Sequence, residues 1–184
     1  MSRPKVFVSS TYVDLAGLRE ALSNSLDDMG YEPILFENDG IFFDSSMPLD
    51  HSCYEAAKDS DLFILVVGGR YGSPSTRDRR KSKKRRYNSI TKNEYLTARG
   101  AGVPIYTFVE RKVLDEYATW KNNPHTRDSI RFAHVDNPAI FELVHGIHGL
   151  TVNNVIKPFS SVEDIVRTMK AQLAHLVQSA IKLR

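Results

Sequence analysis

Cysteine is almost absent from this chain of 184 residues, in which Cys53 stands alone. A single cysteine forms no internal disulfide and no cysteine cluster for zinc, so disulfide scaffolds and zinc ribbons are excluded. Long hydrophobic runs are also absent: the longest covers residues 62 to 67, whereas a membrane span needs about 20 apolar residues. Residues 1 to 10 lack the apolar segment of a signal peptide. We therefore expect a cytoplasmic protein that does not cross a membrane, with Cys53 as an ordinary helix residue.

Two familiar nucleotide-binding signatures are missing as well. The stretch GGRYGS, residues 68 to 73, lacks the Gly-Lys-Ser/Thr ending of a P-loop and does not match G-x-G-x-x-G. Only His145 and His148 lie close together among the six histidines, and such a pair without further ligands does not make a metal site. We expect no bound metal.

One dense basic run stands out in what the chain does contain. Residues 77 to 86, RDRRKSKKRR, hold eight Lys or Arg and one Asp, a local charge of +7; since the chain as a whole carries +3, the rest has 3 − 7 = −4. The first interpretation is a flexible, solvated insertion over residues 75–88. Binding of nucleic acid or another anionic partner is the second, although no aromatic side chains interleave the run for base stacking.

Length and composition are those of one globular domain, which we expect to span residues 1–184. Strand patterns alternate with helical patterns, and the run at 62 to 67 is apolar on both faces, as in a central parallel strand. The alternation predicts an α/β fold: a three-layer, doubly wound parallel sheet of about five strands in flavodoxin-like order, with the ligand crevice at the carboxyl ends of the strands. The expected strands cover residues 5–10, 32–36, 61–69, 103–109 and 153–159, and helices begin near residues 14, 50, 91, 113, 138 and 161.

The last helix is expected to be long. Residues 160 to 163, Ser-Ser-Val-Glu, form a capping box that opens it, and an apolar stripe follows at helical spacing as far as residue 181. About 22 residues at 1.5 Å each span roughly 33 Å, more than a helix needs to cover a sheet. We therefore expect its far end to pack on a second copy of the chain, which predicts a homo-oligomer.

The turn SSTYVD, residues 9 to 14, joins the first strand to the first helix at the expected ligand edge. Its hydroxyl side chains and free backbone N–H groups suit phosphate or ribose hydroxyls. On the residues alone, Ser10, Thr11 and Asp14 either contact such a ligand or only make the turn and cap the helix.

The segment GGRYGS follows the central strand at the same edge. Glycines such as Gly69 let a ligand approach the backbone, and Arg70 offers a fork of donors for phosphate or carboxylate. The alternative is a flexible exit from the strand, and the local sequence leaves both open.

Glu94 has two alternative roles, as a helix cap or as a catalytic group. Thr91-x-x-Glu94 matches the capping box, in which the glutamate reaches back to the N-cap N–H, so capping explains it completely. Its helix nonetheless starts near the ligand edge of the sheet. A carboxylate there would stabilise or attack an oxocarbenium-like ribosyl carbon while an N-glycosidic bond breaks.

Several segments together resemble one family: KVFVSSTYVDL, GYEPILFE, SCYEAAKDSDLFILVVGGRYGS, SITKNEYLTARGAGVPIYTFV and VIKPFSSVEDIV. In this order they resemble the family catalogued as domain of unknown function 4062. The resemblance covers most of residues 4 to 166, and the paired FVSST and SITKNEY signals are specific. Leu18 departs from the family, which usually has a glutamate before the arginine, so any role of that acidic residue is absent. The basic insert at residues 77 to 86 is also atypical.

The family is similar in fold to TIR (Toll/interleukin-1 receptor) domains and nucleoside 2-deoxyribosyltransferases. In both groups a glutamate near the start of the helix before the fourth strand cleaves the N-glycosidic bond of NAD or exchanges a base on a deoxyribose. By motif position the resemblance assigns this catalytic role to Glu94. It also implies that Ser9, Ser10 and Asp14 face the nucleotide and that Arg70 and Tyr71 border it. No cofactor is required, and NAD is the expected substrate.

Members of the family often stand as N-terminal modules of larger sensor proteins, many in antiphage or other signalling systems. We expect this chain to be that module standing alone, controlled by a separate sensor or effector protein. Two alternatives remain: a non-catalytic module for self-association or partner recognition in which Glu94 caps its helix, and a nucleic-acid-binding protein that uses residues 77 to 86.

Overall fold

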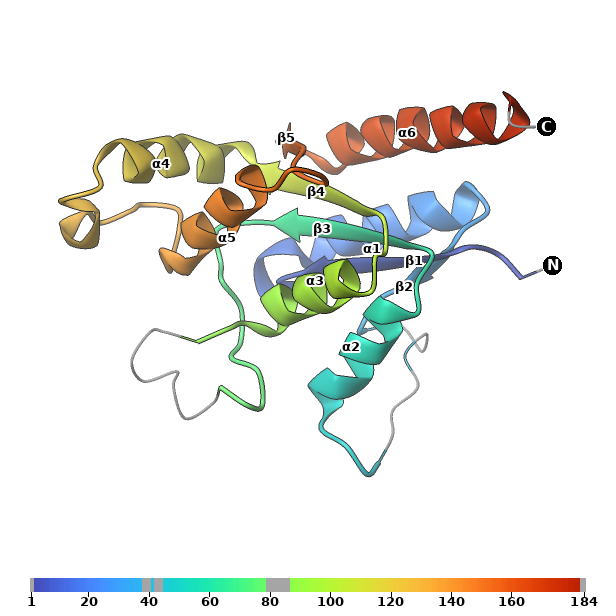
Figure 1. Cartoon of the computed structure of the whole chain (residues 1–184), viewed down its shortest axis with the longest axis horizontal. Coiled ribbons are helices and arrows are strands. Elements are labelled where there is room, and N and C mark those ends of the chain that lie inside the picture. Colours follow the sequence, from blue (N-terminus) through green and yellow to red (C-terminus); the bar gives the residue numbers. More distant parts are fainter. Residues whose placement is uncertain (1, 38–40, 42–44, 79–86, 183–184) are drawn as a thin grey trace.

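The computed structural model describes residues 2–37, 41, 45–78 and 87–182, and its centre is one parallel sheet (Figure 1). The strand order is β2-β1-β3-β4-β5, and every pairing within the sheet is parallel. This is the flavodoxin-like order that the alternating sequence patterns predicted. The strands are β1 (Lys5–Ser10), β2 (Glu32–Ile34), β3 (Leu62–Val67), β4 (Ile105–Glu110) and β5 (Ile156–Phe159).

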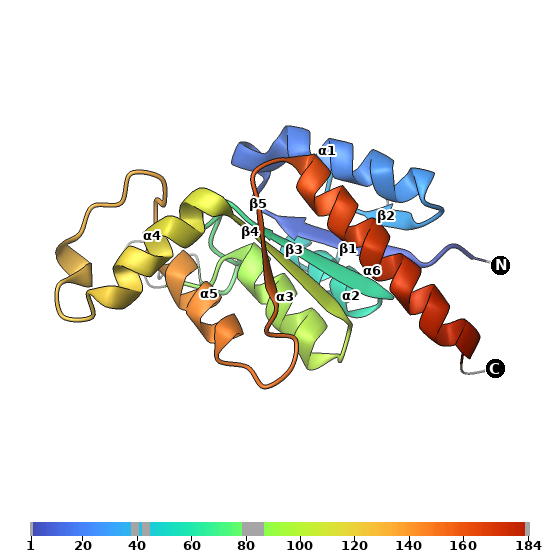
Figure 2. The same ribbon diagram turned by 90° about the horizontal axis from the view of Figure 1, so that it is seen from above.

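Helices cover both faces of the sheet, which gives the predicted three layers (Figure 2). Because successive side chains of a strand point to opposite faces, Val6 and Val8 of β1 share a core with α1 and α6, whereas Phe7 stacks on Phe63 in the opposite core. That opposite core is completed by α2, α3, α4 and α5. The helices are α1 (Tyr12–Asp28), α2 (Leu49–Lys58), α3 (Ile90–Gly100), α4 (Arg111–Asn122), a short 3-10 helix (Arg127–Ser129), α5 (Ala139–His148) and α6 (Val162–Lys182).

Local signals place most element ends to within a few residues. Gly30 follows α1 with a φ of +86°, as expected for a glycine that ends a helix. The helix α5 begins at Ala139, one residue after the predicted start, and the Ala139 N–H donates to the Asn137 side chain at 3.0 Å. The strand β2 is shorter than expected, since it ends at Ile34 and the chain then turns out of the sheet.

The start of α6 differs from the predicted capping box. The helix begins at Val162, and the Ser160 N–H donates to Asp164 Oδ2 at 3.0 Å. Asp164 rather than Glu163 therefore accepts from this backbone N–H, because the helix starts one residue later than the box requires.

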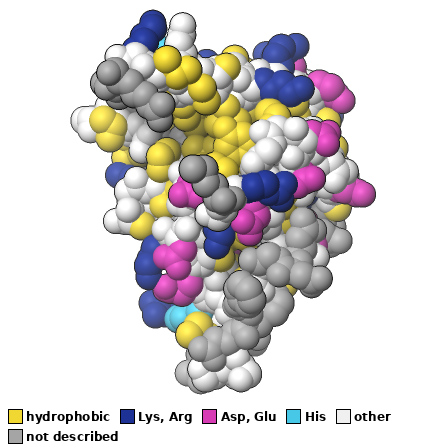
Figure 3. All heavy atoms as spheres, turned by 90° about the vertical axis from the view of Figure 1, so that its right-hand side faces the viewer, with side chains coloured by type: hydrophobic (Ala, Val, Ile, Leu, Met, Phe, Trp, Pro, Cys, Tyr) yellow, Lys and Arg dark blue, Asp and Glu magenta, His cyan; other side chains and the backbone are white. Residues whose placement is uncertain are grey.

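The helix α6 extends past the sheet at the end of the molecule where the chain terminates (Figures 1 and 2). Its first half is held by Ile165, Met169 and Leu173, which are buried against the sheet. Figure 3 shows hydrophobic side chains gathered in the upper part of the face at this end. No helix among the described residues is long and apolar enough to cross a membrane. The exposed large apolar side chains of α6 are Leu176, Val177 and Ile181.

The ends of the predicted insertion at residues 75–88 lie side by side. Pro74 and Ser89 form an isolated bridge, and the Asn88 N–H donates to the Asp78 carboxylate at 3.1 Å. Residues 79–86, which hold most of the basic run, lie outside the described residues. The predicted flexibility and anion binding of that run therefore stay predictions.

Candidate functional site

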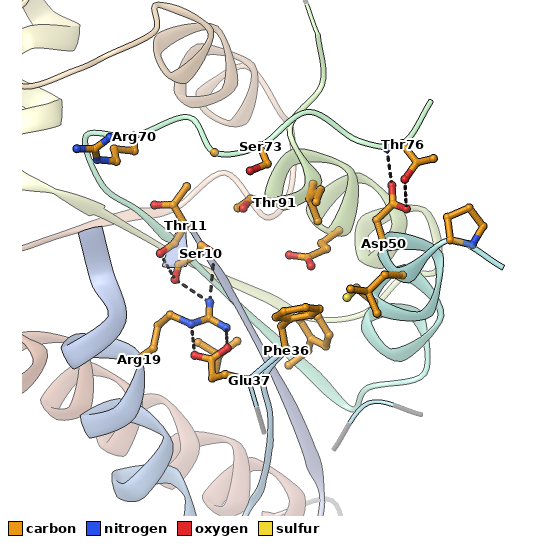
Figure 4. A pocket seen from close by; sticks show the side chains of 18 of the residues that line it. Ser10, Thr11, Arg19, Phe36, Glu37, Asp50, Arg70, Ser73, Thr76 and Thr91 are labelled. Carbon is orange, nitrogen blue, oxygen red and sulfur yellow. Dashed lines mark hydrogen bonds and ion pairs between the residues drawn. The ribbon is translucent and has the colours of Figure 1, made fainter. Parts of the chain in front are cut away.

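A cavity of about 670 Å³ opens at the carboxyl ends of β1 and β3 (Figure 4). Its wall is built from the β1–α1 turn, the segment after β2, the start of α2, the segment after β3 and the first turns of α3. The crevice thus lies where the parallel topology predicts ligand binding.

Glu94 is a buried carboxyl in the wall of this cavity. It lines the wall from the second turn of α3, and only 6% of its surface is exposed. The Ser9 hydroxyl at the end of β1 donates a hydrogen bond to Glu94 Oε2 at 2.5 Å. The carboxyl is therefore held from the neighbouring strand.

The predicted capping box at Thr91 is wrong. The helix α3 begins at Ile90, its N-cap is Ser89, and the Ser89 hydroxyl accepts from the Lys92 N–H at 3.2 Å. The residue that a box would use is consequently Lys92, and Glu94 lies two residues beyond it. A cap does not explain why a glutamate is buried here.

Burial in this cavity raises the pKa of Glu94 to about 7. Desolvation is the largest cause, and the Glu37 and Asp50 carboxylates add to it. The Ser9 hydrogen bond and the Arg19 charge act in the opposite direction and favour the carboxylate. Near neutral pH the group is present in both protonation states, as general acid–base or nucleophilic chemistry requires.

Arg19 was not predicted as a site residue, yet it lines the cavity and is only 3% exposed. Its Nε and Nη2 donate to the two oxygens of Glu37 at 2.5 and 2.6 Å, and its Nη1 donates to Ser10 Oγ at 2.9 Å. In Figure 4 the guanidinium lies between Ser10 and Glu37. The sequence held one signal: Arg19 occupies a position of the apolar stripe between Leu15 and Leu22, where a charge requires a buried partner.

The β1–α1 turn contributes Ser10 and Thr11 to the cavity wall. Ser9 reaches it through its hydrogen bond to Glu94. Asp14 is exposed, accepts a hydrogen bond from the Thr11 hydroxyl and lines a second hollow of about 660 Å³ instead. The structure thus brings three of the four predicted turn residues together at the first cavity and places Asp14 outside it.

The predicted site residues in the segment after β3 also lie in different places, and only one of them lines the first cavity. Arg70 lines the wall of both hollows. Gly69 lines only the second, and a Cβ built on it would lie 2.5 Å from the carbonyl oxygen of His134, so protein rather than ligand fills that space. Tyr71 is 3% exposed, and its hydroxyl donates to the Tyr87 carbonyl at 3.0 Å, so it supports the segment from within the core.

The segment after β2 and the start of α2 form another side of the cavity, which carries both apolar and charged side chains. Phe36 and Leu49 line it and are 45% and 49% exposed. Asp50 beside them is buried and accepts from the backbone N–H and hydroxyl of Thr76 at 2.8 and 2.7 Å. Burial raises the pKa of Asp50, but these hydrogen bonds outweigh it and the pKa is lowered overall. Cys53 also lines the cavity, and burial raises its pKa to about 12, so the thiol is neutral.

A family model described as Domain of unknown function (DUF4062) matches residues 5–174. The chain belongs to the DUF4062 family. A search of curated proteins returned no match. The matched residues contain all five strands and every described residue of the cavity wall in this DUF4062 domain.

Within the residues that the structure describes, no group of three or more His, Cys, Asp or Glu is placed to hold a metal ion. The cavity instead offers a buried carboxyl, hydroxyls from Ser10, Thr11 and Thr91, and the Arg70 guanidinium. Such a set suits an organic ligand with hydroxyl and anionic groups.

Proposed function

We propose that this DUF4062 domain binds a nucleotide or nucleoside and cleaves its N-glycosidic bond with Glu94. The observation that carries the proposal is the buried carboxyl in the cavity wall, which takes no part in capping its own helix. Burying an ionisable group costs stability unless it is paired, and Glu94 forms no ion pair at salt-bridge distance among the described residues. A functional use accounts for that cost.

The chemistry follows from the position of one carboxyl. As the bond from the anomeric carbon to the base nitrogen breaks, its electron pair leaves with the base, and positive charge develops on the ribosyl carbon. The Glu94 carboxylate stabilises that charge or forms an ester with the carbon, which water or another hydroxyl then attacks. The acceptor decides between hydrolysis, cyclisation and transfer.

NAD is the substrate we propose first. Its nicotinamide ring is a cation and leaves as a neutral molecule, so no proton donor is needed and a single carboxylate suffices. The two sides of the cavity suit the two parts of such a ligand: Phe36 and Leu49 offer an apolar surface for a flat ring, whereas Arg70 offers donors for phosphate. In Figure 4 Arg70 lies on the opposite side of the view from Asp50, with Phe36 nearer to Asp50.

The test is a chromatographic assay of NAD and a panel of nucleosides and nucleotides with the wild type and Glu94→Gln. Protein concentration should be varied, because modules that act after assembly are inactive when dilute. We expect free base to be released by the wild type only, at a rate that rises as the pH passes about 7 and Glu94 ionises. Equal release by both proteins, or none from any substrate at any concentration, would refute the proposal.

The setting that we propose is a cytoplasmic signalling or antiphage system in which a separate protein controls the domain. Self-association is part of this proposal, because Leu176, Val177 and Ile181 on α6 are 47%, 56% and 67% exposed and continue a buried stripe. A second copy that pairs along this stripe would bury them. Light scattering with Ile181→Asp, beside the control Gln178→Asp on the same exposed turn, should show a smaller particle for the first variant only.

A non-catalytic interaction module is the second candidate, and the same exposed stripe favours it. It predicts self-association without turnover. Nucleic-acid binding through residues 77 to 86 is a third expectation, for which salt-sensitive binding that neutral substitutions abolish is the measurement.

A further inference from the structure

A partly buried ion pair lies beside the proposed catalytic group. The Arg19 side chain is 4% exposed, that of Glu37 is 26% exposed, and both nitrogen–oxygen contacts are at 2.5 to 2.6 Å. Glu37 is charged, because the hydrogen bonds and charge of Arg19 outweigh the effect of burial and lower its pKa. Replacing such a pair by apolar side chains is often neutral or stabilising, so stability alone does not explain why it is here.

The pair is connected to Glu94 through two adjacent serines at the end of β1. Arg19 Nη1 donates to Ser10 Oγ at 2.9 Å and to the Ser10 carbonyl at 3.2 Å. Ser9, the preceding residue, donates to Glu94 at 2.5 Å. The guanidinium and the Glu94 carboxyl are therefore hydrogen-bonded to two adjacent residues of the same strand.

Charged and titratable groups face Glu94 from three parts of the chain. The helix α1 contributes Arg19, the segment after β2 contributes Glu37, and α2 contributes Asp50 and the neutral side chains of Cys53 and Tyr54. Of the charges, that of Arg19 favours the carboxylate, whereas those of Glu37 and Asp50 oppose it. The two members of the ion pair thus act on Glu94 in opposite directions.

We propose that the Arg19–Glu37 ion pair sets the charge and position of the Glu94 carboxyl, so that Arg19 and Glu37 are positioning residues of the site. The consequence for turnover rests on the proposed function, whereas the effect on Glu94 does not. Because Phe36 and both members of the pair line the same cavity, a ligand that fills the cavity would lie beside the pair.

The test is the pKa of Glu94 itself, measured by NMR titration of its side-chain carboxyl carbon and assigned by its loss in Glu94→Gln. Removing the negative charge in Glu37→Gln should lower the pKa by about 1, and removing the positive charge in Arg19→Gln should raise it by about 1. The double variant should return close to the wild-type value. Glu55→Gln, which breaks the exposed pair with Lys58 on α2, is the matched control and should leave the titration of Glu94 in place.

If the pKa of Glu94 shifts in opposite directions in the two single variants, the cause is the change of charge and not structural damage. Water entry caused by damage would lower the pKa of Glu94 in both single variants, and a pair without influence would change neither; each of these outcomes overturns the inference. Arg19→Gln leaves Glu37 unpaired, and that can prevent folding. In that case the effect of the arginine substitution on the pKa of Glu94 is measured by comparing the double variant with Glu37→Gln. Adding the arginine substitution to that background must raise the pKa.

Turnover provides a second readout that separates this inference from the proposed function. If the domain releases base, the pH of half-maximal rate should move with the measured pKa, down in Glu37→Gln and up when Arg19 is then replaced. If no turnover is found but the pKa of Glu94 shifts in opposite directions in the two single variants, the proposed function is refuted and the ion-pair inference stands. Turnover whose pH profile is the same in all variants would refute the inference alone.

Discussion

Glu94→Gln is predicted to be more stable than the wild type at alkaline pH. The pKa of Glu94 is raised from 4.5 to about 7, chiefly by burial. Below pH 4.5 the carboxyl is protonated in the folded and the unfolded chain, so the ionisation of Glu94 does not lower the free energy of unfolding. As the pH rises towards 7 the unfolded chain loses this proton first, and the folded state loses stability until Glu94 is also ionised. A pKa difference of about 2.5 at about 1.4 kcal/mol for each unit corresponds to about 3 kcal/mol.

Denaturant unfolding of both proteins at pH 5 and pH 8 measures this cost directly. The advantage of the glutamine variant should grow by about 2 to 3 kcal/mol between the two pH values, because glutamine stays neutral. Glu55→Gln reports how much of any change comes from losing a glutamate elsewhere. If Glu94→Gln is less stable than the wild type by the same amount at both pH values, the carboxyl is a structural group and the reasoning fails.

Three further substitutions test the surroundings of the cavity through the free energy of unfolding. Gly69→Ala should cost about 1 to 3 kcal/mol, because its Cβ would lie 2.5 Å from the His134 carbonyl oxygen; no loss would show that the two segments separate easily. Ser89→Ala should cost about 1 kcal/mol as the lost N-cap of α3, and an unchanged free energy would contradict that assignment. Asp50→Asn should cost about 1 to 3 kcal/mol at neutral pH, since it weakens two hydrogen bonds from Thr76, and the difference should shrink as the pH falls below about 4; a constant difference would contradict the lowered pKa.

The fold followed from patterns that depend on local sequence. The unbroken apolar run of β3 predicted a strand buried on both faces, and alternating strand and helix patterns predicted a parallel sheet. The exact ends depended on contacts distant in sequence. Ser89 and Thr91 are both suitable caps for α3, and the choice is made by Ser73 and Pro74, which pair with Ile90 and Ser89 from across the insertion.

The candidate site could be predicted only in part, for the same reason. Family motif position indicated Glu94, whereas the local pattern favoured a cap. The glycines after β3 suggested ligand contact, but the space beside Gly69 is taken by His134, which lies far along the chain. The ion pair of Arg19 and Glu37 joins a helix to a segment outside the sheet, and no periodic pattern identifies such a partner.

Release of free base from NAD at pH 8 by the wild type and by Glu94→Gln tests the central claim most directly. The account predicts that the wild type releases nicotinamide at high protein concentration, and that the variant, although at least as stable at this pH, releases none. Nicotinamide release by the variant at the wild-type rate would show that Glu94 is not the catalytic group.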